Sequence, residues 1–109
     1  MLELTTAEAF ADFIREGRAV VEFYTTWCPD CKRIEPYLPE WEAQYQGSFR
    51  MARANAEEIP EVSEQFDVKG IPSFLVFENG ELVNRLYSRD AKTKQQVAAF
   101  LDQAYISVV

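Results

Sequence analysis

The chain has 109 residues, enough for one hydrophobic core but not for two. Apolar residues make up 48% of it, a composition that predicts a folded protein and excludes a disordered one. The formal net charge of −7 argues against a protein that binds the nucleic-acid backbone, since no cluster of Lys and Arg in the sequence is long enough to displace counterions. We therefore expect one domain over residues 1–109 that has no nucleic-acid partner.

The first half of the chain predicts a helix, a buried strand and a longer helix. Residues 5–8, TTAE, match the capping box that opens helices, and the apolar face after them ends at Gly17. Residues 19–25, AVVEFYT, form a continuous β-branched and aromatic run, which is typical of a strand buried on both faces. A helical pattern then extends over residues 29–45, and Pro36 inside it should kink that helix.

The second half of the chain predicts mainly strands, closed by a helix. Its pattern indicates a strand at 48–56, a short helix at 60–66 and two strands at 73–77 and 81–87. The last two strands flank Asn79-Gly80, a dipeptide typical of a tight hairpin. Residues 93–96, TKQQ, match a second capping box, which opens the final helix. With a further short strand at residues 2–4, this order predicts a mixed sheet with helices on both faces.

The N-terminus and the hydropathy of the chain bear on where the protein works. The first ten residues, MLELTTAEAF, contain no basic segment followed by an apolar run. No window of the sequence is apolar for long enough to span a membrane. We therefore expect a cytoplasmic protein with no membrane partner. Structural disulfides are rare in the cytoplasm, so the cysteines need another explanation.

Both cysteines, Cys28 and Cys31, lie in the stretch TTWCPDCKR, where the buried strand passes into a helix. Cys28 would lie at the helix N-cap, where its sulfur faces free backbone N–H groups and the positive end of the helix dipole. Cys31 would lie one turn further in and be less exposed. In such a pair the outer thiolate attacks a disulfide, and the inner thiol resolves the mixed disulfide that forms. The spacing therefore predicts a redox-active pair.

Three other roles for the cysteine pair are weaker. A zinc site needs two further ligands, and the chain has no histidine and no other cysteine, so we expect no metal. A structural disulfide across two residues would close only a very small loop. Two inert buried cysteines remain an alternative, although a strand–helix junction is an unusual place for them. The absence of histidine also excludes a Cys–His nucleophile pair.

Two long segments of the chain resemble the thioredoxin family. Residues 20–36, VVEFYTTWCPDCKRIEP, resemble its strand and active-site segment, including the tryptophan before the first cysteine and the lysine after the second. Residues 69–83, KGIPSFLVFENGELV, resemble its Gly-Ile-Pro segment, hairpin turn and following strand. The resemblance covers nearly the whole chain. It implies an α/β fold of the thioredoxin-like kind, a three-layer sandwich with a central mixed β-sheet and helices on both faces.

The resemblance also implies three substrate-binding residues. Pro72 would follow a cis peptide bond and face the cysteines; the alternative is a trans proline that opens an edge strand. Ile71 would offer backbone hydrogen bonds to a substrate strand. Trp27 would flank the Cys28 sulfur as part of the docking surface, in addition to or instead of simple packing.

A charged residue in the middle of VVEFY, Glu22, is costly to bury without a partner. Its position matches the family's buried aspartate, which relays a proton to the resolving cysteine. Burial should raise the pKa of Glu22 toward the working pH, which suits a general base for Cys31. Arg53 falls where the family has the lysine that pairs with this acid. The alternative is an ion pair of Glu22 and Arg53 with a structural role only.

Between the cysteines, Pro29 and Asp30 replace the family's usual Gly-Pro. Pro29 suits the first helical turn, where its missing N–H costs nothing. The Asp30 carboxylate should disfavour a thiolate at Cys28 and so alter redox potential and partner choice. Lys32 completes the residues expected to tune the site, together with Arg53.

In the third active-site loop, Ser88 replaces the family's glycine within the stretch YSRDAK, which is also a little longer than usual. Glycine at that position lets a partner's backbone approach closely. We therefore expect Ser88 and Arg89 to restrict large protein substrates, and we expect small disulfides or mixed disulfides of low-molecular-weight thiols to be preferred.

The sequence thus predicts a thiol–disulfide oxidoreductase that reduces disulfide-containing proteins or small disulfides. Its redox group is the reversible Cys28–Cys31 disulfide, with no bound cofactor. The resemblance implies that an NADPH-dependent thioredoxin reductase supplies the electrons and is a partner. We expect a monomer. The alternative is an adaptor module whose groove binds a partner and whose cysteines turn over little.

Overall fold

The computed structural model of the protein describes residues 1–106, so the last three residues of the expected domain lie outside the described part. The elements in chain order are β1 (Leu2–Glu3), α1 (Ala7–Ile14), β2 (Arg18–Tyr24), α2 (Pro29–Ile34), η1 (Glu35–Tyr37), α3 (Leu38–Tyr45), β3 (Arg50–Asn55), α4 (Pro60–Gln65), β4 (Ser73–Glu78), β5 (Glu81–Leu86), η2 (Ser88–Asp90) and α5 (Lys94–Ile106). The order agrees with the expected one. No helix within residues 1–106 is both long enough and apolar enough to cross a membrane.

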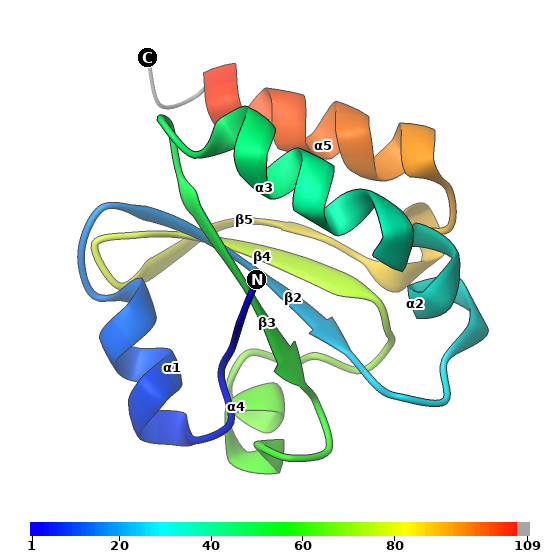
Figure 1. Ribbon diagram of the computed structural model, residues 1–109. Helices are drawn as coiled ribbons and strands as arrows, with labels where there is room; N and C mark the ends of the chain where they lie inside the picture. The colour runs from blue at the N-terminus through cyan, green and yellow to red at the C-terminus, as the bar shows by residue number, and fades with distance from the viewer. Residues whose placement is uncertain (107–109) are drawn as a thin grey trace.

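The strands form one five-stranded sheet in the order β1-β3-β2-β4-β5. The first three run parallel, whereas β4 is antiparallel to β2 and β5 is antiparallel to β4. Figure 1 shows α3 and α5 on one face of this sheet and α1 and α4 on the other. The mixed sheet between two helical layers is the architecture that the sequence predicted.

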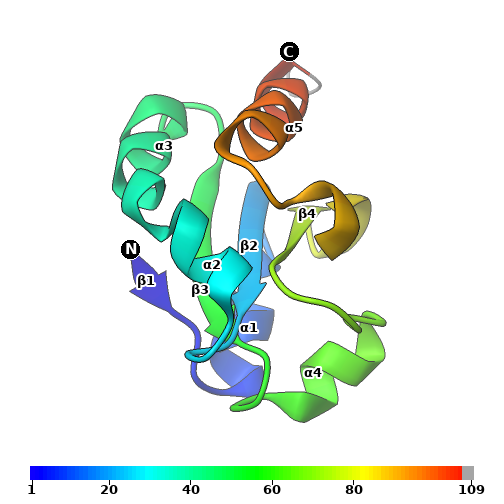
Figure 2. The ribbon, with the colours of Figure 1, turned by 90° about the vertical axis from the view of Figure 1, so that its right-hand side faces the viewer.

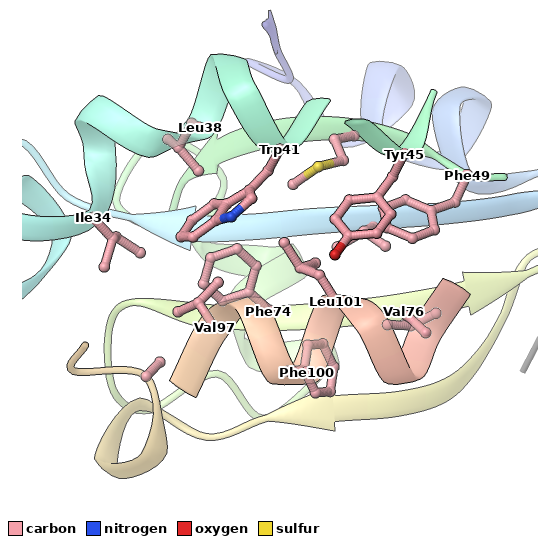
Figure 3. Close-up of a cluster of buried hydrophobic side chains, with 14 residues drawn as sticks. Ile34, Leu38, Trp41, Tyr45, Phe49, Phe74, Val76, Val97, Phe100 and Leu101 are labelled. Carbon is pink, nitrogen blue, oxygen red and sulfur yellow. The ribbon is translucent and has the colours of Figure 1, made fainter. Parts of the chain in front are cut away.

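Two hydrophobic clusters, one on each face, hold the layers together. Successive residues of β2 alternate between them, so Val20 packs toward α3 and α5, whereas Val21 packs toward α1 and α4. Figure 3 shows the first cluster, in which Trp41, Phe74 and Leu101 meet between α3, the sheet and α5. Each fully buried side chain of this size contributes about 1.5–3 kcal/mol. By the same alternation Glu22 lies on the Val20 face of β2.

The two predicted capping boxes fare differently. Thr93 and Gln96 bond reciprocally: the Gln96 N–H donates to Thr93 Oγ1 (3.1 Å) and the Thr93 N–H donates to Gln96 Oε1 (3.2 Å). The box at residues 5–8 is wrong by one position, because the N-cap is Thr6, whose Oγ1 accepts from the Ala9 N–H (3.0 Å). Starting the helix one residue later still buries Phe10.

The continuous helix predicted over residues 29–45 is also wrong in detail. The chain forms α2, then the 3₁₀ turn η1, then α3. Pro36, in η1, has no N–H to donate to the preceding turn, so the regular helix stops there and restarts at Leu38. The expected kink at Pro36 is confirmed as a break between α2 and α3. The break leaves α2 only six residues long.

The hairpin at Asn79-Gly80 is confirmed. Both residues have positive φ, 51° and 89°, which is the conformation that this dipeptide adopts most readily. The Asn79 side chain also accepts from the Gly17 N–H (2.9 Å), which connects the β4–β5 turn to the end of α1.

Candidate active site

The two thiols lie at the start of α2, which follows β2 in the chain after a short loop. Cys28 is the N-cap of α2, with extended φ and ψ of −81° and 115°, and its Sγ accepts from the Cys31 N–H (3.1 Å). Pro29 occupies the first helical position. Both cysteines are free thiols, Cys28 4% exposed and Cys31 fully buried. The expected inner and outer positions are therefore present.

The loop before β4 faces the thiols. The Ile71–Pro72 peptide bond is cis, as predicted. The Cys28 thiol donates to the Ile71 carbonyl (3.8 Å), and Ile71 packs with Tyr24 and both cysteines. The sulfur that would attack a substrate thus lies directly against the predicted substrate-binding loop.

Trp27, the residue before Cys28 that was expected to belong to the docking surface, is 62% exposed. Its indole N–H donates to both carboxylate oxygens of Glu57, at 3.2 and 3.3 Å. Glu57 is held in turn, since its backbone N–H donates to the Asn55 side chain (2.9 Å). Sequence reasoning missed Glu57, which lies 30 residues from Trp27 with no motif to join them.

Glu22 is fully buried, and Arg53 Nε donates to its Oε1 (2.9 Å). The pairing of β2 with β3 sets Glu22 directly beside Arg53, so strand register alone brings them together. The other carboxylate oxygen, Oε2, has no hydrogen-bond partner among the described residues. Burial raises the pKa of Glu22 to about 7, and the Arg53 charge and hydrogen bond act against that rise.

Arg53 is shared among three carboxylates. Besides Glu22, it reaches Glu35 through Nη2 (3.2 Å) and Glu3 through Nη1 (3.5 Å). Its guanidinium lies over the Tyr24 ring at 3.7 Å, and the Tyr24 hydroxyl donates to Glu3 (2.6 Å). One cation therefore compensates the buried acid only in part. Sequence reasoning did not foresee the contribution of Glu3 and Glu35.

The buried thiol is a poor acid in this site. Burial raises the pKa of Cys31 well above the ordinary thiol value, and the Cys28 sulfur raises it further. A hydrogen bond from the Thr25 backbone acts in the opposite direction. Because ionised Cys31 is unfavourable, a nearby base is needed to remove its proton. Glu22, with its pKa near neutrality, has the properties of such a base.

Asp30 lies between two cations that sequence reasoning did not assign to it. Arg33 Nη1 is 2.5 Å from Oδ1, and Lys92 Nζ is 2.9 Å from Oδ2. Hydrogen bonds from Lys92 and Arg33 hold the pKa of Asp30 below its usual value. The carboxylate is thus charged, as expected, but the two cations offset its charge at Cys28. Lys32, the other expected tuning residue of this turn, is exposed.

Ser88 opens η2 and lies against Gly70 in the cis-proline loop. A Cβ built on Gly70 would come within 2.1 Å of Ser88 Oγ and 3.0 Å of its Cβ. The Ser73 hydroxyl donates to the Gly70 carbonyl (2.6 Å) and holds the loop from the other side. The third active-site loop and the cis-proline loop are therefore in direct contact.

Within residues 1–106 there is no group of three or more His, Cys, Asp or Glu side chains placed to hold a metal ion. The reactive groups that the structure brings together at this site include two thiols and one buried carboxylic acid.

Comparisons with known proteins agree with this geometry. A thioredoxin family model matches residues 1–103. Thioredoxin from Staphylococcus haemolyticus is 33% identical over 98 residues, which cover 90% of this chain and 92% of that protein. Thioredoxin-2 from Pyricularia oryzae is 32% identical over 84 residues, 76% of this chain, and the match spans only 48% of that relative.

A solved structure agrees as well. That of Plasmodium falciparum thioredoxin superposes with a TM-score of 0.87 at 24% identity, covering 94% of this chain and 98% of the other. This likeness confirms the predicted fold. The family model and the Staphylococcus relative extend over almost the whole chain, including both cysteines. The protein therefore belongs to the thioredoxin family of thiol–disulfide oxidoreductases.

Proposed function

We propose that the protein reduces substrate disulfides with Cys28 as the nucleophile, Cys31 as the resolving thiol and Glu22 as the proton acceptor. The observation that carries this proposal is the Cys28 thiol at the N-cap of α2, bonded to the Cys31 N–H and packed against the cis-proline loop. Residues 1–109 act as one domain in this proposal.

The reaction has two exchange steps. The Cys28 thiolate attacks one sulfur of the substrate disulfide, forms a mixed disulfide and releases the first substrate thiolate, which takes up a proton. Glu22 then accepts the Cys31 proton through a buried water, and the Cys31 sulfur attacks Cys28. The second substrate thiol leaves, and the protein holds the oxidised Cys28–Cys31 pair. Two electrons have passed from the protein to the substrate.

The α2 helix end supports the first step. The Cys31 N–H points at the Cys28 sulfur, and a hydrogen bond from a backbone amide stabilises a thiolate more than a thiol. The Ile71 carbonyl lies 3.8 Å from that sulfur. In this proposal Ile71 forms the substrate-binding surface together with Trp27, the residue before Cys28, and Pro72, the residue after Ile71. In this proposal the reactivity of the cysteine pair is tuned by four further residues, Pro29, Asp30, Lys32 and Arg53.

Regeneration requires an external reductant, since each turnover leaves a disulfide. We assign this role to an NADPH-dependent thioredoxin reductase, with the protein acting as a cytoplasmic monomer. Purified protein, NADPH, a thioredoxin reductase and an excess of a disulfide substrate should consume NADPH continuously. If the protein causes no NADPH consumption at all, that reductase is ruled out. Consumption that stops after one equivalent would instead show that the reduced protein does not pass its electrons to the substrate. Cell fractionation and sedimentation test the location and the monomeric state.

We infer a preference for small disulfides or mixed disulfides from Ser88, which stands where the family has a glycine and packs against Gly70 of the cis-proline loop. A comparison of rates for insulin and for several small disulfides tests this. Faster reduction of insulin than of every small disulfide would contradict it.

The decisive variant is Cys28→Ser. It should abolish disulfide reduction, whereas an adaptor that uses only the groove would keep its partner. Reductase activity that survives in Cys28→Ser would show that Cys28 is not the nucleophile. The reduction potential gives an independent check: a value near about −270 mV fits a reductase, and one above about −200 mV an oxidant or isomerase.

A further inference from the structure

The charges of the molecule are unevenly distributed around Cys28. Residues 28–34 and 88–94 together carry five of the 11 cationic residues and two of the 18 carboxylates, so these segments have a net charge of +3 within a chain of −7. We call their five cations the basic patch: Lys32, Arg33, Arg89, Lys92 and Lys94. All five side chains are exposed.

Contacts join the two segments of the basic patch. Lys92 and Arg33 both bind the Asp30 carboxylate, and Arg33 also donates to the Lys92 carbonyl (3.2 Å). Lys94 lies over the Tyr37 ring at 4.5 Å, which directs its charge along the α2–η1 side. Figure 2 shows α2 facing the viewer, with the loop before α5 above it. The basic patch thus borders the active-site turn on this side.

The opposite side of the same turn is acidic. Residues 57–67 contain five carboxylates and no cation, and all five are exposed. We call them the acidic patch: Glu57, Glu58, Glu61, Glu64 and Asp67, of which Asp67, at the far end, pairs with Lys69 (3.5 Å). Trp27, next to Cys28, donates to Glu57, so the acidic patch begins where the docking surface does. In Figure 2, α4 lies below α2, on the side away from α5.

We propose that the two patches select and orient substrates whose disulfide is flanked by carboxylates on one side and by cations on the other. The proposal rests on the proposed disulfide reduction and adds to it a class of substrate, a short peptide segment with charges of opposite sign around its cystine, in keeping with the preference for small disulfides. Complementary charges favour one docking orientation, and like charges penalise the other. A uniformly acidic or basic segment meets one favourable and one unfavourable patch.

Peptide disulfides that are charge isomers test the proposal. Two peptides share one composition and zero net charge; one has glutamates before its cysteine and lysines after it, and the other has the reverse. Because their net charges are equal, the −7 charge of the protein affects both equally. We expect kcat/KM to differ by about fivefold at low salt, since several exposed pairs act together. The difference should vanish near 1 M salt, where the Debye length is about 3 Å.

Variants locate the effect. Lys92→Glu and Glu58→Lys should each reduce the ratio of the two rates toward one. Asp30→Asn should increase it, because Arg33 and Lys92 lose the carboxylate that occupies them. Arg15→Glu, a charge change of the same size at the exposed C-cap of α1, should leave the ratio unchanged. Equal rates for the two isomers, or a ratio that Arg15→Glu lowers as much as Lys92→Glu, would overturn the proposal.

A binding measurement separates this proposal from the reductase activity. The same isomers with serine in place of cysteine bind without reacting, and the fluorescence of Trp27 reports their affinity. Isomers that bind with different affinity while neither disulfide form is reduced would contradict the proposed function and support the patches. Equal affinities of the two isomers, with normal reduction of both disulfides, would support the proposed function and contradict the role of the patches.

Discussion

Two ion-pair networks flank the cysteine pair, and they differ mainly in their access to water. Below Cys31, one cation, Arg53, serves the buried Glu22 together with two other carboxylates. Beside Cys28, two cations serve one carboxylate, Asp30, at the surface. Both networks consist of ordinary carboxylates and cations at hydrogen-bond distance, and in both the cations lower the pKa of the acid. The pKa of Glu22 nevertheless lies above its ordinary value, whereas that of Asp30 lies below it.

Burial accounts for the opposite directions. The pKa of Glu22 rises to about 7 despite a 2.9 Å bond to Arg53, because loss of water outweighs one shared guanidinium. The pKa of Asp30 falls, because its hydrogen bonds to Lys92 and Arg33 outweigh the smaller effect of its partial burial. A contact distance therefore does not tell whether an acid near a thiol stays charged. Near neutral pH, Glu22 in the buried network can therefore take up and release a proton, whereas Asp30 in the surface network stays charged.

The largest effect should come from removing the buried acid. In Glu22→Gln the mixed disulfide loses the base that deprotonates Cys31, and its resolution should slow by about 100-fold or more. In the wild type this step should accelerate as pH rises through about 7, where Glu22 ionises, and the variant should lack that inflection. Rapid quenching and mass spectrometry of the mixed disulfide measure the rate.

Glu78→Gln is the matched control for this prediction. Glu78 also lies on the sheet and pairs with an arginine, Arg18 at 2.5 Å, but its side chain is 48% exposed. It should leave the resolution rate and its pH profile unchanged. If Glu22→Gln resolves the mixed disulfide at the wild-type rate, the Glu22–Arg53 pair has a structural role only.

Stability should show the same network through its pH dependence. Folding raises the pKa of Glu22 from 4.5 to about 7, so the folded state holds more protons between these values. The stabilisation is therefore complete below pH 4.5 and is lost as pH rises through 7. Relative to Glu22→Gln, the wild type should lose about 3 kcal/mol of unfolding free energy across this window. A pH-independent difference in urea unfolding would contradict the pKa shift.

Arg53→Met should produce the next largest effect. The variant keeps the aliphatic stem of Arg53 but removes the one cation bonded to Glu22, so the pKa of Glu22 should rise by about 1 or more. The inflection of the resolution rate should then move to higher pH by the same amount. Infrared titration of the protonated carboxyl measures the shift directly. An inflection that stays in place would mean that Arg53 does not compensate Glu22.

The exposed network should contribute least to stability. Exposed ion pairs are weak and screened by salt, so Asp30→Asn should change the thermal midpoint by no more than about 4 °C. Any change should disappear in high salt. A large decrease of the thermal midpoint that does not depend on salt would show that the bonds of Asp30 to Arg33 and Lys92 stabilise the active-site turn as strongly as buried bonds would.

These networks also mark how far the sequence could predict the molecule. Features encoded by adjacent residues were correct or nearly so: the hairpin at Asn79-Gly80 and the box at Thr93 and Gln96 were confirmed. The first helix N-cap was misplaced by one residue, because Thr5 and Thr6 are chemically equivalent caps. The break at Pro36 was underestimated, since a local pattern does not show that a helix restarts in a new direction.

Within the site, the sequence correctly predicted the placement of residues that belong to the family motifs. It did not predict contacts between residues that only the tertiary fold brings together. The cysteines, the cis bond before Pro72 and the pairing of Glu22 with Arg53 were expected. The partners of Asp30 and Trp27 were not, because Lys92 is 62 residues from Asp30 and Glu57 is 30 residues from Trp27. Exposed charges carry no periodic signal, so only the folded chain reveals which of them meet.

Because Ser88 contacts Gly70, the residues that evolution can place in one of these two loops depend on the residue in the other. With only 2.1 Å between a Cβ at position 70 and the serine oxygen, the two loops share a volume that can hold one side chain but not two. A change at either position is therefore permitted or forbidden by the residue at the other. Among relatives, a side chain at one of these positions should therefore accompany glycine at the other. The Ser88 loop should fit a thioredoxin with glycine at the position of Gly70 but not one with a larger residue there.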